Sequence, residues 1–369
     1  MKMLIASCFG GSRNEIIADF FRAKGIEVLQ VESDYDHINK AEKAKRSTVK
    51  YIKVIKYKKN ISVKRIVSHY FFAVDLLKIL QEYKPDIVYV AIPPNFIAYF
   101  IVKYKISFPN VKLYFDIIDL WPESMPFSRF FKQVFFPRIW KALRNDSLKY
   151  VDKIIIECDL YKSVLPKPCE TLYLSTTSVM TLGDIHIDDY CNKLEICYLG
   201  SINHIIDIDI ILLLVNLISK YKHLVFHIIG DGEKRNFFLE KLAKYRIEVI
   251  FHGKVFDSSY KKKIFEHCAF GINMLKDITM VGLTTKSIDY FAYGIPILNT
   301  IKGDTWNIVE KEHIGFNITP DNLELTTQEI CGLDNISIYN MRINTYKVYE
   351  KYFSKKAFHK RLTEIFEDK

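Results

Sequence analysis

Glycine and proline are scarce in this chain of 369 residues, which contains 14 of the first and 11 of the second. This excludes collagen-like and low-complexity chains, and a hydrophobic content of 49% excludes disorder. Long apolar runs are also missing, because the longest one, Ile87–Val102, is interrupted by Pro93-Pro94-Asn95. It falls short of the roughly 20 residues that a membrane-spanning helix needs. The remaining apolar material is enough for about two packed domains.

Cysteine pairs with a recognisable spacing are absent as well. The seven cysteines are scattered, their number is odd, and no two are separated by only two residues. This pattern favours a reduced, cytoplasmic interior over a disulfide framework or a zinc site.

Acidic residues are in short supply only in the first half of the chain. Residues 1–165 hold 28 Lys and Arg against 17 Asp and Glu, whereas residues 166–369 hold 25 against 26. Residues 40–65 contain 11 basic residues and one acid, and residues 128–144 mix basic side chains with Phe130, Phe131, Phe135, Phe136 and Trp140. We expect this half to dock on an anionic membrane, although a solvated basic face over core aromatics is the alternative. No nucleic-acid-binding motif is present, so a nucleic acid is not the expected partner.

Short apolar runs alternate with longer helical patterns along the chain. Continuous apolar strands such as Ile87–Ala91 and Leu194–Leu199 are typical of parallel sheets covered by helices on both faces. The alternation stops between Pro166 and Cys191, which predicts a linker at residues 169–192. We therefore predict an α/β fold with two doubly wound, Rossmann-like domains, at residues 1–168 and 193–349. Ligands should bind at the carboxyl ends of the strands, in a cleft that the domains face.

The run from Met280 to Pro296 is the most informative motif. Gly282, Leu283 and Thr284 precede a helix whose free N–H groups and dipole favour a diphosphate. Lys286 lies in the first turn, where a cation opposes the dipole unless an anion lies between them. Asp289, one turn later, could accept hydrogen bonds from ribose hydroxyls. The alternative is a solvated lysine and a surface acid.

Three further strand ends of the second half carry candidate ligand contacts. Gly200 and His204 follow one strand, Gly232 the next, and Lys254 the one after. His204 could donate to a phosphate oxygen or serve as a structural cap. The two glycines would let a nucleotide approach the backbone, and Lys254 would lie near its base. Taken singly, each of these motifs is only a turn.

Two motifs of the first half also follow strands. Gly10 and Gly11 open a helix after the first strand, so they predict either an anion-binding loop or a plain tight turn. Asp119, Trp121 and Glu123 come after a later strand, where carboxylates could bind sugar hydroxyls and the indole could stack on a sugar face. A helix cap with a buried aromatic is the alternative. Neither a histidine nor a third acid is nearby, so we expect no metal.

In their order along the chain, these motifs resemble bacterial GT-B glycosyltransferases of glycosyltransferase family 4, in the branch that assembles capsule, O-antigen or cell-wall polysaccharide. The resemblance implies a retaining, metal-independent hexosyltransferase without a cofactor, whose donor is a UDP-, dTDP- or GDP-sugar. It implies a lipid-linked glycan acceptor on residues 1–168, the donor on residues 193–349, and a last helix, at about 350–369, that packs back on the first domain. The protein would then be peripheral, on the inner face of the plasma membrane.

The resemblance also assigns roles. Lys286, His204, Asp119 and Glu123 would take part in catalysis, and the other residues proposed above would hold the substrates. Asp289 falls where the family has the second glutamate of its E-x7-E motif. The first glutamate falls on Val281, and a conserved arginine and lysine of the family fall on Ser201 and Ile206. These departures leave two alternatives open, namely a nucleotide-sugar epimerase and a non-catalytic adaptor of a partner transferase.

Overall fold

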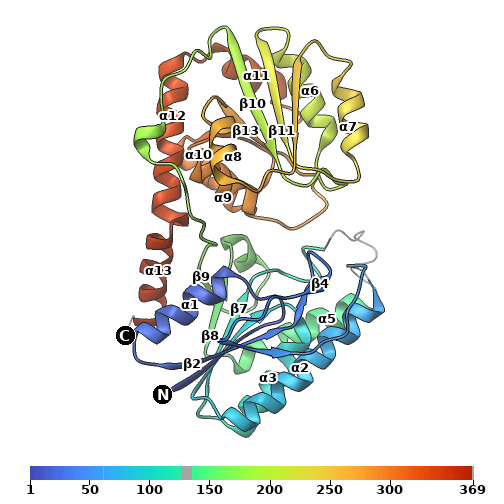
Figure 1. The fold of residues 1–369 in the computed structure, drawn as a ribbon, viewed down its shortest axis with the longest axis vertical. Coiled ribbons are helices and arrows are strands. Elements are labelled where there is room, and N and C mark those ends of the chain that lie inside the picture. The colour runs from blue at the N-terminus through green and yellow to red at the C-terminus, as the bar shows by residue number, and fades with distance from the viewer. Residues whose placement is uncertain (61, 126–134, 368–369) are drawn as a thin grey trace. The chain divides into compact units, whose positions relative to one another are not determined.

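The computed structural model describes residues 1–60, 62–125 and 135–367. Phe130 and Phe131, which the sequence suggested for membrane docking, lie outside these ranges, and so do the side chains of Phe135 and Phe136. The chain forms two compact units (Figure 1). The first unit comprises Met1–Leu172 with the chain from Arg361 onward, and the second comprises Tyr173–Lys360.

The first unit is built on a parallel sheet of seven strands. From one edge to the other the strands are β5 (Val49–Ile52), β2 (Glu27–Ser33), β1 (Lys2–Ser7), β6 (Ile87–Ile92), β7 (Lys112–Ile117), β8 (Lys153–Ile156) and β9 (Glu170–Thr171). The central strand β6 has the sequence IVYVAI and is buried along its whole length, which explains why it carries no alternation of polar residues. A separate antiparallel hairpin of β3 (Tyr35–Asp36) and β4 (Ala41–Glu42) follows β2.

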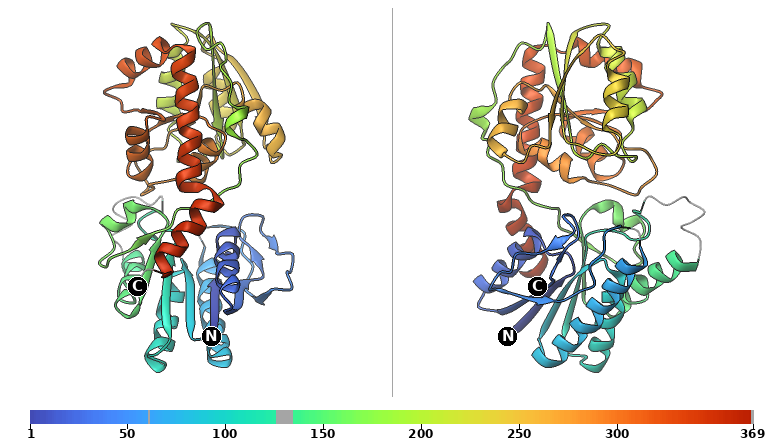
Figure 2. Two further views of the ribbon diagram at one scale, coloured as in Figure 1. Left: turned by 90° about the vertical axis from the view of Figure 1, so that its left-hand side faces the viewer. Right: turned by 45° about the vertical axis from the view of Figure 1, so that its right-hand side comes forward.

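Helices cover both faces of this sheet (Figure 2). They are α1 (Ser12–Ala23) and the end of α13 (Lys355–Glu367) on one face, and α2 (Val63–Tyr83), α3 (Asn95–Ser107) and α5 (Phe135–Asn145) on the other. The last turns of α13 are held by the first unit, because Arg361 donates to the carbonyl of Thr171 at 2.9 Å and Phe366 packs on Phe21 and Tyr114.

The second unit has a parallel sheet of six strands. Their order is β12 (Glu248–Gly253), β11 (His223–Ile229), β10 (Lys193–Leu199), β13 (Phe270–Asn273), β14 (Ile297–Asn299) and β15 (Gly315–Asn317). The order reverses between β10 and β13, as it does between β1 and β6 in the first unit, so both sheets are doubly wound.

Two clusters of buried residues pack on the two faces of the second sheet. The helices that contribute to them are α6 (Ile208–Ile218), α7 (Arg235–Leu242) and α11 (Leu323–Gly332) on one side, and α8 (Ser258–Phe265), α9 (Thr285–Ala292) and α10 (Asp304–Glu312) on the other, with α12 (Asn335–Val348) in both. Residues 173–192 belong to this unit rather than standing apart from it, and Met180, Ile185 and Tyr190 are buried in its core.

Among the described residues, none of the helices combines the length and the apolar character that crossing a membrane requires.

Candidate functional site

The loop that leads from β13 into α9 is anchored at two points near the start of the helix. Thr284 caps α9, because its hydroxyl accepts a hydrogen bond from the Ser287 amide at 3.1 Å. Earlier in the loop, the Gly282 carbonyl accepts from both the amide and the hydroxyl of Thr305, at 2.8 and 2.7 Å. The first N–H groups of α9 are therefore presented by a fixed loop, at the edge of the sheet where ligands of doubly wound domains bind.

Lys286, in the first turn of α9, is a cation without a counterion. No carboxylate in the described parts of the chain pairs with it, and its ammonium lies 5.2 Å from the centre of the Tyr198 ring. The side chain also packs against Gly200, where a Cβ atom would lie 3.9 Å from Lys286 Cδ. Burial lowers the pKa of Lys286 to about 7. Bringing an anion to this ammonium would restore its charge, so the position of Lys286 suits an anionic ligand.

Asp289 lies one helical turn beyond Lys286 and is half-buried. Burial raises the pKa of its carboxyl, and the charge of Lys261 partly offsets this effect. No hydrogen bond to this carboxylate is present within the described residues. It can therefore accept hydrogen bonds from a ligand, as a pair of ribose hydroxyls would require.

A ladder of three asparagines, two of them buried, is joined to the loop by a hydrogen bond, and the sequence analysis missed it. Asn273, Asn299 and Asn317 stand in register on β13, β14 and β15. Asn273 donates to Asn299 at 2.9 Å, Asn299 donates to Asn317 at 2.8 Å, and the Thr284 hydroxyl donates to Asn273 at 3.3 Å. Asn273 and Asn299 lie near the ends of apolar runs that indicate strands, and they were the signal that could have revealed it; the short β15 of Asn317 was not predicted.

The glycines that follow β11 make room for the backbone of the loop after β10. A Cβ at Gly230 would lie 1.9 Å from the Gly200 carbonyl oxygen, and one at Gly232 would lie 2.3 Å from the Ile202 carbonyl oxygen. The loops are also hydrogen-bonded, since the Ile202 amide donates to the Asp231 carbonyl at 3.0 Å. The close contact between the two loops is therefore sufficient reason for a glycine at position 232, independent of any role in a nucleotide site.

His204 and Lys254 are both exposed. His204 Nδ1 lies 3.2 Å from a carboxylate oxygen of Glu233, and no hydrogen bond or ion pair joins it to Lys286 in the described chain. Lys254 follows β12 directly. Lys286 and Tyr198 thus lie together near Gly200, whereas His204 and Lys254 lie on separate loops.

Asp119 and Glu123 occupy the loop after β7 in the first unit. Asp119 accepts a hydrogen bond from Trp121 Nε1 at 2.6 Å and another from Ser124, and burial raises its pKa. Glu123 forms ion pairs with Arg144 at 2.9 Å and with Lys141 at 3.1 Å. These cations keep the pKa of Glu123 below its usual value in spite of burial. Both carboxylates therefore hold the loop together.

Trp121 does not offer its ring to a ligand, which corrects the expectation from the sequence. Only 7% of the residue is exposed. The guanidinium of Arg65 lies 4.6 Å from the centre of its ring, and the imidazole of His69 stacks on it at 6.1 Å. The indole is part of an aromatic cluster of the first unit rather than a platform for a sugar.

Gly10 and Gly11 follow β1 and differ in their surroundings. A Cβ at Gly10 would lie 2.2 Å from Oε2 of Glu32, so the glycine makes room for a carboxylate of the protein itself. Gly11 has a φ of +118° and open space around it, and it lines a pocket that also contains Lys43 and Arg46. The sequence analysis counted Lys43 and Arg46 in the basic segment 40–65 but did not expect them to line a pocket.

No group of three or more His, Cys, Asp or Glu side chains in the described chain is arranged to hold a metal ion.

Residues 193–334 match the family described as Glycosyl transferases group 1. This range contains the whole site around α9. No curated protein matches the sequence of the chain.

Solved structures match over the full length. Sucrose-phosphate synthase from Thermosynechococcus elongatus is 12% identical with a TM-score of 0.69, covering 100% of this chain and 98% of that one. Anabaena HepE in complex with UDP-glucose is 12% identical with a TM-score of 0.63, covering 99% and 98%. WaaG, a glycosyltransferase involved in lipopolysaccharide biosynthesis, is 13% identical with a TM-score of 0.65, covering 100% of both chains. The fold is GT-B. The predicted GT-B fold is thereby confirmed, and together with the family match it supports a glycosyltransferase.

Proposed function

We propose that this protein is a retaining, metal-independent hexosyltransferase of glycosyltransferase family 4 that acts in bacterial surface polysaccharide synthesis. It moves a sugar from a UDP-, dTDP- or GDP-sugar to a lipid-linked glycan. The observation that carries the proposal is Lys286, a half-buried cation with no acidic partner in the described chain, beside the N-terminus of α9. The match of residues 193–334 to group 1 glycosyl transferases and the UDP-glucose bound to HepE support it.

In the proposed mechanism the diphosphate lies against the first N–H groups of α9. Gly282, Leu283 and Thr284 shape its binding loop, Lys286 compensates its charge, and Asp289 binds the ribose. The bond between the anomeric carbon and the diphosphate oxygen breaks, and the acceptor oxygen forms the new bond on the same face. The proton of the acceptor hydroxyl passes to the departing phosphate oxygen, so no nucleophile of the protein is needed. Stabilising the leaving group is the main catalytic contribution of such a site.

The remaining sequence-based assignments belong to the same proposal. His204 assists at the diphosphate, Gly200, Gly232 and Lys254 lie on the nucleotide side, and the first unit takes the acceptor. Within that unit Gly11 borders the pocket, while Gly10, Asp119 and Glu123 shape the surrounding loops.

Calorimetric titration with UDP, dTDP and GDP tests the donor site. One of the three should bind the wild-type protein, and Lys286→Met should weaken that binding by roughly tenfold to a hundredfold, the effect of one lost charged hydrogen bond. Lys220→Met is the matched control, because Lys220 is an exposed lysine of the same unit. Equal affinities of the two variants would refute the role of Lys286.

An adaptor without activity is the second candidate, and one observation favours it. The loop after β10 contains no cation where the family has two, since Ser201 is uncharged and Ile206 is only 2% exposed. The same titration decides between the two functions, because an adaptor with an inactive site should bind none of the three nucleotides.

Association with an anionic membrane is a further part of the proposal. Lysines between residues 40 and 65 are exposed on the first unit: Lys45, Lys50, Lys53, Lys56, Lys58, Lys59 and Lys64. Tyr70, Phe71 and Tyr99 on α2 and α3 are also more than 40% exposed, whereas Trp140 is buried. Flotation with anionic liposomes tests the proposal, and a protein that stays in the soluble fraction at low salt would refute it.

A further inference from the structure

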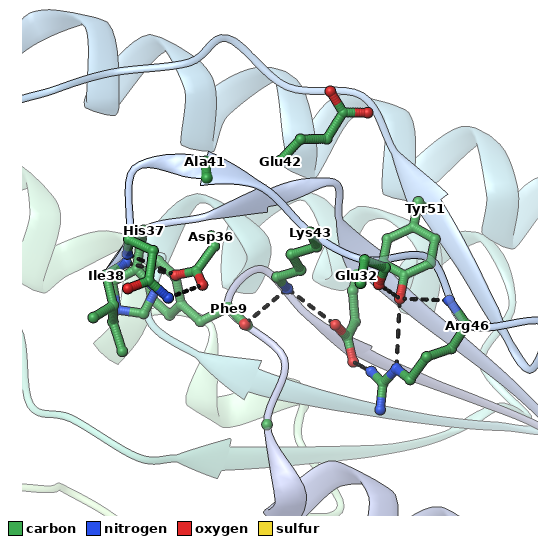
Figure 3. A pocket seen from close by; sticks show the side chains of 13 residues that line it. Phe9, Glu32, Asp36, His37, Ile38, Ala41, Glu42, Lys43, Arg46 and Tyr51 are labelled. Carbon is green, nitrogen blue, oxygen red and sulfur yellow. Dashed lines mark hydrogen bonds and ion pairs between the residues drawn. The ribbon is translucent and has the colours of Figure 1, made fainter. Parts of the chain in front are cut away.

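A cavity of about 440 Å³ lies in the first unit, at the carboxyl ends of β1 and β2 (Figure 3). Phe9 and Gly11, from the loop between β1 and α1, form one side, and residues of the β3–β4 hairpin and the segment after it form the other. Its volume lies in the range of small-molecule sites. Because β1 adjoins the point where the strand order reverses, this is also the edge at which such sheets bind ligands.

The two cations of the pocket are matched by two carboxylates, because both pair with the buried Glu32 and Arg46 pairs with Glu15 as well. Glu32, whose side chain is 4% exposed, accepts from Lys43 Nζ at 3.0 Å and from Arg46 Nη2 at 2.6 Å. Lys43 also donates to the Phe9 carbonyl at 2.8 Å, so its ammonium lies between the loop and the carboxylate, as Figure 3 shows. The carboxylate itself rests against Gly10, which has no side chain to displace it.

The other two carboxylates that line the pocket are also engaged. Asp36 accepts from the amides of Ile38 and Asn39, at 2.8 and 3.1 Å, and thereby fixes the hairpin turn. Glu42 pairs with Lys56 at 3.1 Å. An ionic ligand would have to displace one of these partners and leave a charge uncompensated, whereas a neutral ligand would not.

Hydrogen-bonding capacity nevertheless remains after these pairs have formed. An ammonium has three N–H donors and a guanidinium five, and Lys43 uses two of its three for Glu32 and Phe9. The oxygens of Glu32 retain lone pairs, so fixed donors and acceptors lie side by side. A hydroxyl group, which both donates and accepts, matches this arrangement, and a ring carrying several hydroxyls matches it best.

An aromatic wall completes the pocket. The rings of Phe9 and His37 lie 4.6 Å apart and are tilted by 46°. Burial lowers the pKa of His37, with the charge of Arg65 as a further cause, so its ring is neutral at pH 7. Two uncharged rings beside a set of hydrogen-bonding groups suit the C–H face of a sugar.

We propose that this pocket binds a neutral sugar ring at the end of the acceptor, held by Lys43, Arg46 and Glu32 against the Phe9 and His37 rings. The proposal rests on the proposed glycosyl transfer and adds to it the chemical class of the acceptor.

The test is saturation-transfer NMR on the full chain, with the methyl glycosides of glucose, galactose and N-acetylglucosamine, and with glucuronic acid and inorganic phosphate. Ala41→Trp fills the pocket from the exposed β4, and Ala23→Trp, at an equally exposed alanine at the end of α1, is the matched control. Circular dichroism and nucleotide titration confirm that both variants are folded.

At least one neutral glycoside should give a signal with the wild type and with Ala23→Trp and lose it with Ala41→Trp. Lys43→Met should weaken the same glycoside roughly tenfold. The proposal is overturned if Ala41→Trp keeps the signal, if no neutral glycoside binds, or if only glucuronic acid or phosphate does. Failure of every nucleotide to bind, with glycoside binding intact, would instead refute the glycosyltransferase and leave the pocket standing.

Discussion

Raising the pH from 7 to 9 should weaken the binding of the preferred nucleoside diphosphate by about fifty-fold. Burial lowers the pKa of Lys286 to about 7, so half of these side chains carry a charge at pH 7. At pH 9 only about one in a hundred does, because each pH unit above the pKa costs a factor of about ten. The diphosphate itself does not titrate here, since its last pKa is near 6. The affinity should therefore follow the charge of Lys286.

The titration of Lys286 changes nucleotide affinity and folding stability in opposite directions as the pH rises, which distinguishes a loss of binding from unfolding. A lysine whose pKa is depressed in the folded state binds fewer protons there than in the unfolded chain, over the interval from about 7 to 10.4. The contribution of Lys286 to the free energy of unfolding consequently rises with pH over this interval. At pH 9 the protein should therefore bind the nucleotide more weakly while the contribution of Lys286 to the free energy of unfolding is larger than at pH 7. Unfolding would not explain the loss of affinity.

Calorimetry provides the assay and a second readout. At pH 8 the bound nucleotide should recharge Lys286, so close to one proton should be taken up per nucleotide. The uptake appears as a dependence of the measured enthalpy on the ionisation enthalpy of the buffer. Lys286→Met should abolish both the proton uptake and the steep loss of affinity. An affinity that is flat between pH 7 and 9 in the wild type, or equally steep in the variant, would refute the reasoning.

Three further predictions concern stability, measured as the midpoint of urea unfolding. Gly230→Ala should destabilise the protein by more than about 2 kcal/mol, because its Cβ would lie 1.9 Å from the Gly200 carbonyl oxygen. Gly253→Ala is the control, since no atom lies within 4 Å of its Cβ position. It should cost only the roughly 1–2 kcal/mol of a left-handed backbone conformation. Arg342→Met should cost about 3 kcal/mol or more, since this buried guanidinium donates to three backbone carbonyls and a tyrosine hydroxyl. Burial raises the pKa of Glu157 to about 8. Between about pH 4.3 and 8 the folded protein therefore holds a proton that the unfolded chain has released. The free energy of unfolding should fall as the pH rises over this interval. Glu157→Gln should remove this dependence and raise the midpoint at pH 8 but not at pH 4, and an unchanged midpoint at both would contradict it.

The sequence predicted the fold well because its signals are local. Strands such as Ile87–Ile92 are continuous apolar runs, because a strand that is buried on both faces needs apolar side chains at nearly every position. The ends of helices are harder to place. The apolar pattern before α6 already includes Ile205 and Ile206, but the helix begins at Ile208, where the Asp207 side chain accepts from the Ile210 amide. The capping aspartate, rather than the apolar period, sets that start.

The candidate site was predictable only in part, because it depends on partners far away in the sequence. Lys286 and Thr284 could be identified from the helix start that they form. Glu123 could not be recognised as a partner of Arg144, and Gly232 could not be recognised as a contact of Ile202, until the chain had folded. Function and packing require the same residue types at strand ends, and spacing does not distinguish between them.

The distribution of charge shows how little a net count says about binding. The first half of the chain has the basic excess, yet the two cations of its pocket are matched by Glu32 and Glu15, and that pocket suits a neutral ligand. The second half has none, yet it holds one desolvated lysine without a counterion in the described chain. An ammonium that already has a carboxylate gains little from a second anion, whereas an unpaired one in a low dielectric gains much. In the proposed function, the affinity for a diphosphate would therefore follow from the missing partner of Lys286 and not from the number of basic residues nearby.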